Sequence, residues 1–289
     1  MAAMTAKTPG AGAEGGTPGR VAVITGGAGG LGRVMATALV NAGHKVCALD
    51  VSEAALAALR EHPPLAANPA ALHTVCGNVA QEADCNRAVA EANARLGGVQ
   101  ILINNAGLGP SSLRPDAERN PPGIEELTPE IWERYWGVNV RGAIQMTRAA
   151  LPSMRAGGWG RIVNNTTSFR TMLRILPYGA VKAAFESITA VWAQELASTG
   201  ITANVLVPGG PTDTGFISDD AGWDRAKMLR PDIMGPPTAW LASAAADGFT
   251  GQRITAGLWR EGSAPAAQPE GAVTPIGWPD LGKTSIWPT

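Results

Sequence analysis

The chain has 289 residues, of which 45% are apolar, enough for one large core. It has 23 Lys and Arg residues and 24 Asp and Glu residues, so its net charge is -1. This balance leaves no excess of positive charge to neutralise the phosphate backbone of a nucleic acid. No apolar run reaches the ~18 residues of a membrane-spanning helix, and residues 1–19 lack the apolar core of a secretory signal. We therefore expect a cytoplasmic protein without nucleic-acid or membrane partners.

Composition divides the chain into three parts. Residues 1–19 are rich in Gly, Ala and Pro and have no apolar period, so we expect a flexible N-terminal segment. Residues 20–259 carry the patterns of one folded domain, whereas residues 260–289 hold five Pro and four Gly. Because this last part also contains Trp278, Ile286 and Trp287, we interpret it as a C-terminal arm that docks in extended form.

The sequence gives no support for a metal site. Its cysteines, Cys47, Cys76 and Cys85, lack metal-ligand spacing, and none of its three histidines lies near another ligand residue. We expect the three cysteines to be buried thiols in a reducing compartment, and no metal to be bound.

Short apolar runs alternate with stretches of helical apolar spacing between the two tails. The predicted strands are 21–25, 45–50, 72–76, 99–103, 161–165, 201–207 and 253–256. The predicted helices include 30–42, 81–96, 129–151 and 178–198, and Thr128 followed by Pro129 is a typical helix start. This alternation predicts an α/β fold in a single domain, a Rossmann-type doubly wound parallel sheet of about seven strands.

A glycine-rich turn lies between the first predicted strand and the first predicted helix. The run Thr25–Gly32 reads TGGAGGLG, and its backbone can approach a pyrophosphate at a helix N-terminus. The next predicted strand ends at Asp50, 18 residues past Gly32. A carboxylate there accepts hydrogen bonds from ribose hydroxyls and repels a 2′-phosphate, so we expect NAD rather than NADP.

Further polar residues follow in a fixed order. Asn78 and Val79 follow the third predicted strand, Asn104 to Gly107 (NNAG) follow the fourth, Asn139 lies in the next long helix, and Tyr178 and Lys182 open another helix. In this order the set resembles the short-chain dehydrogenase/reductase family, over roughly residues 20–259. The resemblance implies these cofactor-binding residues: Gly26, Gly30, Leu31, Gly32, Asp50, Asn78, Val79, Asn105, Ala106, Gly107, Tyr178, Lys182, Pro208 and Gly209.

Tyr178 and Lys182 are four residues apart and share one helix face. A free phenol has a pKa near 10, and we expect the neighbouring ammonium and the positive charge of an oxidised nicotinamide to lower it and make Tyr178 a general acid/base. By resemblance, Asn139 positions a water that passes protons to Lys182.

The family's catalytic serine has no clear counterpart in this sequence. Thr167 stands where the resemblance places that serine, but eleven residues before Tyr178 instead of about thirteen, and Ser168 is adjacent. Either hydroxyl can hydrogen-bond the substrate oxygen, with Thr167 slightly favoured.

Three segments bear on the substrate. Leu108–Leu127 is longer than the family pattern and either roofs the pocket or is a surface insertion. Gly215–Pro237 resembles the family's mobile substrate lid. Arg170 and Arg174 either grip a substrate carboxylate or phosphate or face water.

The sequence thus predicts an NAD-dependent dehydrogenase or reductase. It transfers a hydride between NAD(H) and a secondary alcohol or ketone, with Tyr178 as general acid/base. Two alternatives stay open: a dinucleotide-binding regulatory protein on the same fold, and an epimerase or dehydratase using the same Tyr/Lys pair. Tryptophans on helices 129–151 and 178–198, which form a dimer core in relatives, predict a homodimer or homotetramer.

Overall fold

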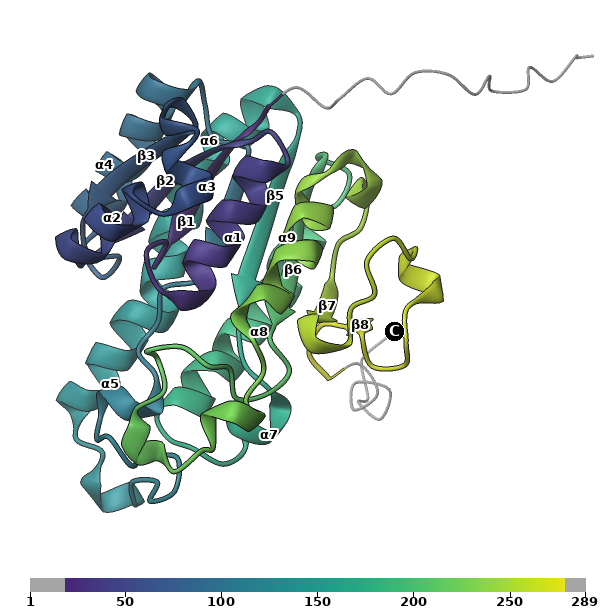
Figure 1. Ribbon diagram of the computed structural model, residues 1–289. Coiled ribbons are helices and arrows are strands. Elements are labelled where there is room, and N and C mark those ends of the chain that lie inside the picture. The colour runs from purple at the N-terminus through teal and green to yellow at the C-terminus, as the bar shows by residue number, and fades with distance from the viewer. Residues whose placement is uncertain (1–18, 279–289) are drawn as a thin grey trace, which may run out of the picture.

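The computed structural model describes residues 19–278, in which eight strands form one sheet (Figure 1). The strands are β1 (Val21–Thr25), β2 (Lys45–Asp50), β3 (Leu72–Cys76), β4 (Ile101–Asn104), β5 (Gly160–Asn165), β6 (Ile201–Val207), β7 (Gln252–Thr255) and β8 (Val273–Pro275). Their order is β3-β2-β1-β4-β5-β6-β7-β8, and only the pairing of β7 with β8 is antiparallel. The doubly wound parallel sheet predicted from the sequence is confirmed, with β8 as an additional edge strand.

Nine helices surround the sheet in the described range. They are α1 (Gly30–Asn41), α2 (Glu53–Arg60), α3 (Pro63–Ala66), α4 (Glu82–Leu96), α5 (Pro129–Trp136), α6 (Gly142–Gly157), α7 (Phe169–Met172), α8 (Tyr178–Glu195) and α9 (Gly235–Ala242). The stretch predicted as one helix over 129–151 is three pieces, because a π-helical turn, Gly137–Arg141, separates α5 from α6. As predicted, Thr128 caps α5 by accepting a hydrogen bond from the Ile131 amide, and Pro129 takes the first helical position.

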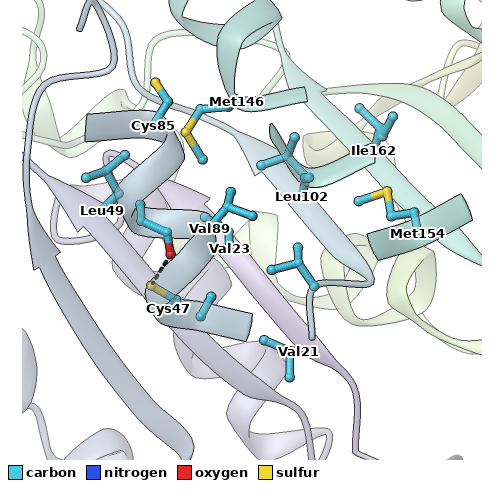
Figure 2. Packing of buried hydrophobic residues seen from close by; sticks show 14 of the residues in the cluster. Val21, Val23, Cys47, Leu49, Cys85, Val89, Leu102, Met146, Met154 and Ile162 are labelled. Carbon is cyan, nitrogen blue, oxygen red and sulfur yellow. Dashed lines mark hydrogen bonds between the residues drawn. The ribbon is translucent and has the colours of Figure 1, made fainter. Parts of the chain in front are cut away.

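Successive residues of each central strand enter opposite halves of the core. Val21 and Val23 of β1 pack with α4 and α6 on one face, whereas Ala22 and Ile24 pack with α1 and α9 on the other. Figure 2 shows the first half, where Met146 of α6 lies among Leu102, Val89 and Leu49. Burial on both faces explains why the strands read as continuous apolar runs.

The cysteine prediction is wrong for one of the three residues. Cys47 and Cys85 are buried, and the Cys47 thiol points at the Ala88 carbonyl oxygen (Figure 2). Cys76 is exposed, because it lies at the end of the edge strand β3. All three are free thiols.

The elements that carry the polar motifs gather at one end of the sheet. The segments after β4 and β6, together with α5 and α7, project beyond the carboxyl ends of the parallel strands (Figure 1). The strand order reverses beside β1, and open α/β sheets bind their ligands at such a switch point. Among residues 19–278, no helix is long and apolar enough to cross a membrane.

Candidate active site

A cavity of about 1020 Å³ opens at this end of the sheet. This volume lies at the upper end of the range for ligand pockets. One half is lined by the glycine loop, Asp50 and the residues after β3; the other half is lined by the ends of β5 and α8, by the insertion 108–127 and by the segment after β6. One half of the cavity therefore suits a dinucleotide, and the other half is left for a substrate.

The glycine loop forms a cradle that side chains would fill. Gly26 has φ of +60°, which favours glycine, and a Cβ at Gly30 would lie 2.5 Å from a methyl carbon of Thr214. Gly26, Gly30 and Leu31 line the cavity. Gly32 does not, since a Cβ there would overlap the Gly26 carbonyl oxygen, so this glycine serves the packing of α1 under the loop.

Asp50 lies at the end of β2 with its carboxylate turned to the glycine loop. Its Oδ2 accepts a hydrogen bond from the Ala28 amide at 3.2 Å, and its Oδ1 accepts one from the Ser52 amide at 3.1 Å. These bonds hold the carboxylate at the cavity wall, which Asn78 and Val79 also line. The residues fit a dinucleotide whose pyrophosphate faces the loop and whose ribose faces Asp50.

The end of β4 is fastened to the end of β1. The Asn105 side chain donates hydrogen bonds to the carbonyl oxygens of Thr25 and Gly26 at 3.1 and 3.0 Å. The Thr25 hydroxyl in turn accepts from the Asn105 and Ala106 amides, each at 3.0 Å. Asn105, Ala106 and Gly107 thereby form the cavity floor beside the loop.

Tyr178 and Lys182 occupy the first two turns of α8 and both line the cavity. The Lys182 ammonium lies 5.9 Å from the centre of the Tyr178 ring and donates a hydrogen bond to the Asn165 carbonyl oxygen at 2.8 Å. Burial lowers the pKa of Lys182 to about 7. Burial raises the pKa of Tyr178 to about 12, against an opposing hydrogen bond with the Thr167 side chain.

Burial thus acts against the lowering of the Tyr178 pKa that the sequence predicts from Lys182 and an oxidised nicotinamide. The phenol is only 7% exposed, and the loss of water around it disfavours the phenolate. Desolvation disfavours both charged forms, so the phenol keeps its proton and the amine loses its own more easily.

Thr167 and Ser168 both line the cavity but have different partners. The Thr167 side chain lies close enough to the Tyr178 phenol to oppose the rise in the pKa of Tyr178. The Ser168 hydroxyl accepts a hydrogen bond from the Thr171 amide at 3.2 Å and lies 2.9 Å from the Thr171 hydroxyl. Ser168 thus caps α7, and Thr167 is the hydroxyl that stands next to the phenol.

Asn139 does not line the cavity; it lies behind the cavity floor in the π-helical turn. Its side-chain amide donates to the Leu108 and Tyr135 carbonyl oxygens at 3.3 and 3.1 Å. A Cβ on Gly107 would lie 2.6 Å from Asn139 Oδ1 and 3.4 Å from Lys182 Nζ, so both atoms face the same point of the backbone. Within residues 19–278 the buried Oδ1 has no hydrogen-bond partner, which fits a place for a water beside Lys182.

Two segments roof the substrate half. The insertion 108–127 contributes Leu108, Pro110 and Glu118, and the segment after β6 contributes Phe216, whose ring centre lies 6.0 Å from that of Tyr178. The two segments also bind each other, because Arg119 donates to the Asp220 carbonyl oxygen at 2.6 Å and the Ser218 amide donates to the Ser111 hydroxyl at 3.1 Å. The insertion is thus part of the pocket. Pro208 and Gly209 line the cavity beneath the segment after β6.

Sequence reasoning missed several residues around the site. Glu118 and Arg134 line the cavity, and burial raises the pKa of the Glu118 carboxyl. Glu186 and Arg253 form a buried ion pair behind Thr167. The spacing of Glu186, four residues after Lys182 on the same helix face, was the available signal.

The chain matches the short chain dehydrogenase family over residues 20–223. An uncharacterized oxidoreductase from Staphylococcus saprophyticus is 33% identical over 215 residues, covering 73% of this chain and 86% of the relative. A sorbitol dehydrogenase from Cereibacter sphaeroides is 34% identical over 210 residues, covering 71% of this chain and 73% of the relative. A solved 3-ketoacyl-(acyl-carrier-protein) reductase from Brucella melitensis, complexed with NADH, has a TM-score of 0.67 and 30% identity, covering 81% and 94% of the two chains.

Fold, cavity and relatives together define an oxidoreductase whose fold binds a nicotinamide dinucleotide. The chain belongs to the short-chain dehydrogenase/reductase family.

Proposed function

We propose that this protein transfers a hydride between NAD(H) and a secondary alcohol or ketone, with Tyr178 as the general acid/base. The observation that carries the proposal is that Tyr178, Lys182 and Thr167 line the same cavity as the glycine loop. A bound nicotinamide supplies the hydride chemistry there. The chain itself supplies position and proton transfer.

Each side chain has one task in this reaction. Thr167 orients the substrate oxygen through its hydroxyl, and Tyr178 exchanges the proton of that oxygen at its own phenol oxygen. With a pKa that burial raises to about 12, the Tyr178 phenol is protonated at neutral pH, which is the form that donates a proton to a ketone oxygen. Lys182, with a pKa of about 7, accepts or releases a proton near neutrality, and Asn139 holds the water next to it.

A turnover screen tests the reaction class. Purified protein with NAD⁺ is offered a panel of secondary alcohols, reduced-cofactor absorbance is followed, and Tyr178→Phe is measured alongside. We expect turnover that falls by at least about 100-fold in the variant, because Phe keeps the ring and removes the proton carrier. Tight NAD⁺ binding without any turnover would favour the regulatory alternative, and product formation without net cofactor change would favour the epimerase or dehydratase.

Cofactor choice is tested at Asp50. We propose NAD because the carboxylate is fixed at the cavity wall by two backbone amides, where it repels a 2′-phosphate. Asp50→Ala should raise the Kd for NAD about tenfold and narrow the gap to NADP, as measured by fluorescence titration of both. An unchanged preference in the variant would contradict the assignment. Glu61→Ala, an exposed carboxylate outside the cavity, is the control.

A further inference from the structure

The substrate half of the cavity holds two arginines without partners. Arg170 and Arg174 lie four residues apart on the segment between Thr167 and Tyr178, and both side chains line the cavity. Within the described range 19–278, neither forms an ion pair or a side-chain hydrogen bond, whereas eleven other arginines pair with carboxylates.

The other charged side chains on this wall are already engaged. Glu118 accepts hydrogen bonds from the Ser111 hydroxyl at 3.1 and 3.2 Å, and Arg134 donates to the Ser112 carbonyl oxygen at 2.8 Å. The cavity lining also includes apolar side chains, among them Ile175 and Trp223. The cavity therefore offers two arginines without ion-pair partners among the described residues, together with apolar surface.

We propose that Arg170 and Arg174 bind an anionic oxygen group of the substrate, so that the preferred substrate is a secondary alcohol or ketone bearing a carboxylate or a phosphate. Guanidinium groups bind both anions in a planar, bidentate geometry. The apolar surface beside them accommodates the chain that joins the anionic group to the reacting carbon. This inference rests on the proposed function.

The test compares matched substrates. Hydroxy acids with the carbinol at increasing distance from the carboxylate are offered with NAD⁺, next to their methyl esters and the corresponding phosphate monoesters. The wild type should use an anionic member with a kcat/KM at least tenfold above its ester. Arg170→Gln/Arg174→Gln should abolish that difference while ester turnover stays within about twofold. The exposed Arg260→Gln, outside the cavity, is the control.

Equal use of anions and esters by the wild type, or a preference that survives in the double variant, overturns the inference. Whether carboxylates or phosphates are preferred identifies the anion. If no substrate turns over, the proposed function fails, and calorimetric binding of the same acids to the NAD⁺-loaded protein then tests whether the two arginines bind an anion. Binding to the wild type that is lost in the double variant supports this inference. No binding to the wild type, or equal binding to the double variant, overturns it.

A buried ion pair behind the cavity wall is a separate feature of the structure. Glu186 of α8 and Arg253 of β7 form an ion pair at 2.6 Å, and their residues are 0% and 4% exposed. Burying two charges is costly unless their remaining hydrogen bonds are satisfied. Here the Thr166 hydroxyl donates to Glu186 at 2.7 Å, and the Gly277 amide approaches the other Glu186 oxygen at 3.5 Å.

The pair is fastened to the segment that carries the candidate hydroxyl. Arg253 Nη2 donates to the Thr167 carbonyl oxygen at 2.6 Å. Lys182 donates to the Asn165 carbonyl oxygen, and Glu186 holds the Thr166 hydroxyl. Three consecutive residues at the end of β5 are thus each bound by a different buried charged side chain.

The C-terminal segment covers this network. The Arg253 guanidinium stacks 4.3 Å from the centre of the Phe169 ring, and Trp278 lies 5.9 Å from the same ring. Ile276 is buried against Val205 and Val207 of β6. The segment after β8 therefore keeps water away from the ion pair.

We infer that Arg253 and Glu186 are positioning residues that fix Thr167 against Tyr178, an inference that also rests on the proposed function. The fork of an arginine can hold Glu186 and the Thr167 carbonyl oxygen together, whereas a lysine has one nitrogen for both. Arg253→Lys keeps the positive charge beside Glu186 and loses the hydrogen bond to the Thr167 carbonyl oxygen. It should lower kcat about tenfold and leave the KM for NAD⁺ unchanged.

A spectroscopic readout separates this inference from the reaction itself. The chain has two tyrosines, Tyr135 and Tyr178, so ¹³C-labelled tyrosine gives two ring signals in a nuclear magnetic resonance spectrum. Arg253→Lys should shift the Tyr178 signal, because the Thr167 side chain beside the phenol moves when its carbonyl oxygen loses Arg253, and leave the Tyr135 signal in place.

Arg161→Lys is the matched control, since Arg161 is a buried arginine at the other end of β5, paired with Asp247. If Arg253→Lys does not fold, Glu186→Leu/Arg253→Met, which leaves no buried charge unpaired, is measured instead and should show the same changes. Wild-type kcat and an unshifted Tyr178 signal, or equal effects of the Arg161 control, overturn the inference.

Discussion

Two adjacent hydroxyls at the end of β5 have distinct partners, and this predicts distinct losses. Thr167→Ala removes the hydroxyl beside Tyr178 and should lower kcat about 100-fold, as the loss of a donor to a reacting oxygen does. Ser168→Ala removes the cap of α7 and should lower the free energy of unfolding by about 1 kcal/mol at nearly unchanged kcat. Steady-state kinetics and urea denaturation measure both. A kcat loss confined to the Ser168 variant would reverse the assignment.

Lys182 predicts a pH dependence of stability. Its pKa of about 7, against 10.5 for a free lysine, means that the unfolded chain binds the extra proton between these values. The wild type therefore gains stability as the pH rises from about 7 to 10.5 and carries the full penalty below 7. The penalty is about 5 kcal/mol at 1.36 kcal/mol per pKa unit. A variant without the amine avoids this penalty but leaves the Asn165 carbonyl oxygen without its donor, at a cost of about 1–3 kcal/mol.

Lys182→Met should accordingly be inactive but more stable than the wild type at pH 6 by roughly 2 kcal/mol or more. The advantage should vanish as the pH approaches 10. Urea denaturation at pH 6, 8 and 9.5 measures it, with the exposed Lys45→Met as the control. A difference from the wild type that stays constant across this range would show that the pKa of Lys182 is the same in the folded and the unfolded chain.

The residues that sequence reasoning found and missed differ in how their partners are arranged. The glycine loop, Asp50 and the Tyr178–Lys182 pair act through backbone turns or through neighbours on one helix face, so their spacing is visible in the sequence. Arg253 acts on Thr166 and Thr167 from 87 and 86 residues away. No local pattern carries that information, because it arises only when β5 and β7 flank β6 in the sheet.

At the scale of elements, burial decided what could be predicted. The seven parallel strands were found because burial on both faces makes them continuous apolar runs. The edge strand β8 was missed, since Val273–Pro275 is three residues long and ends in a proline. The π-helical turn was also missed, because its apolar spacing blends with that of α5 and α6. This turn nevertheless sets the place of Asn139, as π-helical turns at functional sites commonly do.

The roof of the pocket is made by two elements that sequence reasoning treated separately. The insertion after β4 and the segment after β6 lie roughly a hundred residues apart in the chain, and Arg119 joins them by donating to the Asp220 carbonyl oxygen. Within the second segment, Arg225 binds both Asp213 at 2.8 Å and Asp219 at 2.6 Å. The two roof segments are thus joined by hydrogen bonds, and ion pairs at the surface hold the second segment together. Surface ion pairs are individually weak and permit opening.

For the molecule as a whole, exposed apolar side chains on α8 and α5 predict that copies of the chain associate. Trp132 and Trp192 pack partly into the chain's own core beside Tyr135 and Phe185, but Val191 of α8 is 57% exposed and Trp136 of α5 is 41% exposed. We expect a second copy of the chain to cover this surface in a homodimer or homotetramer. Sedimentation velocity should then show an assembly for the wild type.

Val191→Glu places a charge on the surface that we expect to be buried between copies, where it costs far more than in water. The variant should sediment as a monomer. Ile124→Glu is the matched control, because Ile124 is 81% exposed in the insertion after β4, away from α8, and its variant should assemble like the wild type. A wild type that sediments as a monomer, or a Val191 variant that still assembles, would mean that α8 meets solvent and that the exposed apolar side chains serve another contact. Tyr178 and Lys182 lie on the opposite, buried face of the same helix. Any loss of kcat in the Val191 variant would therefore measure how much the assembly contributes to holding these two residues in place.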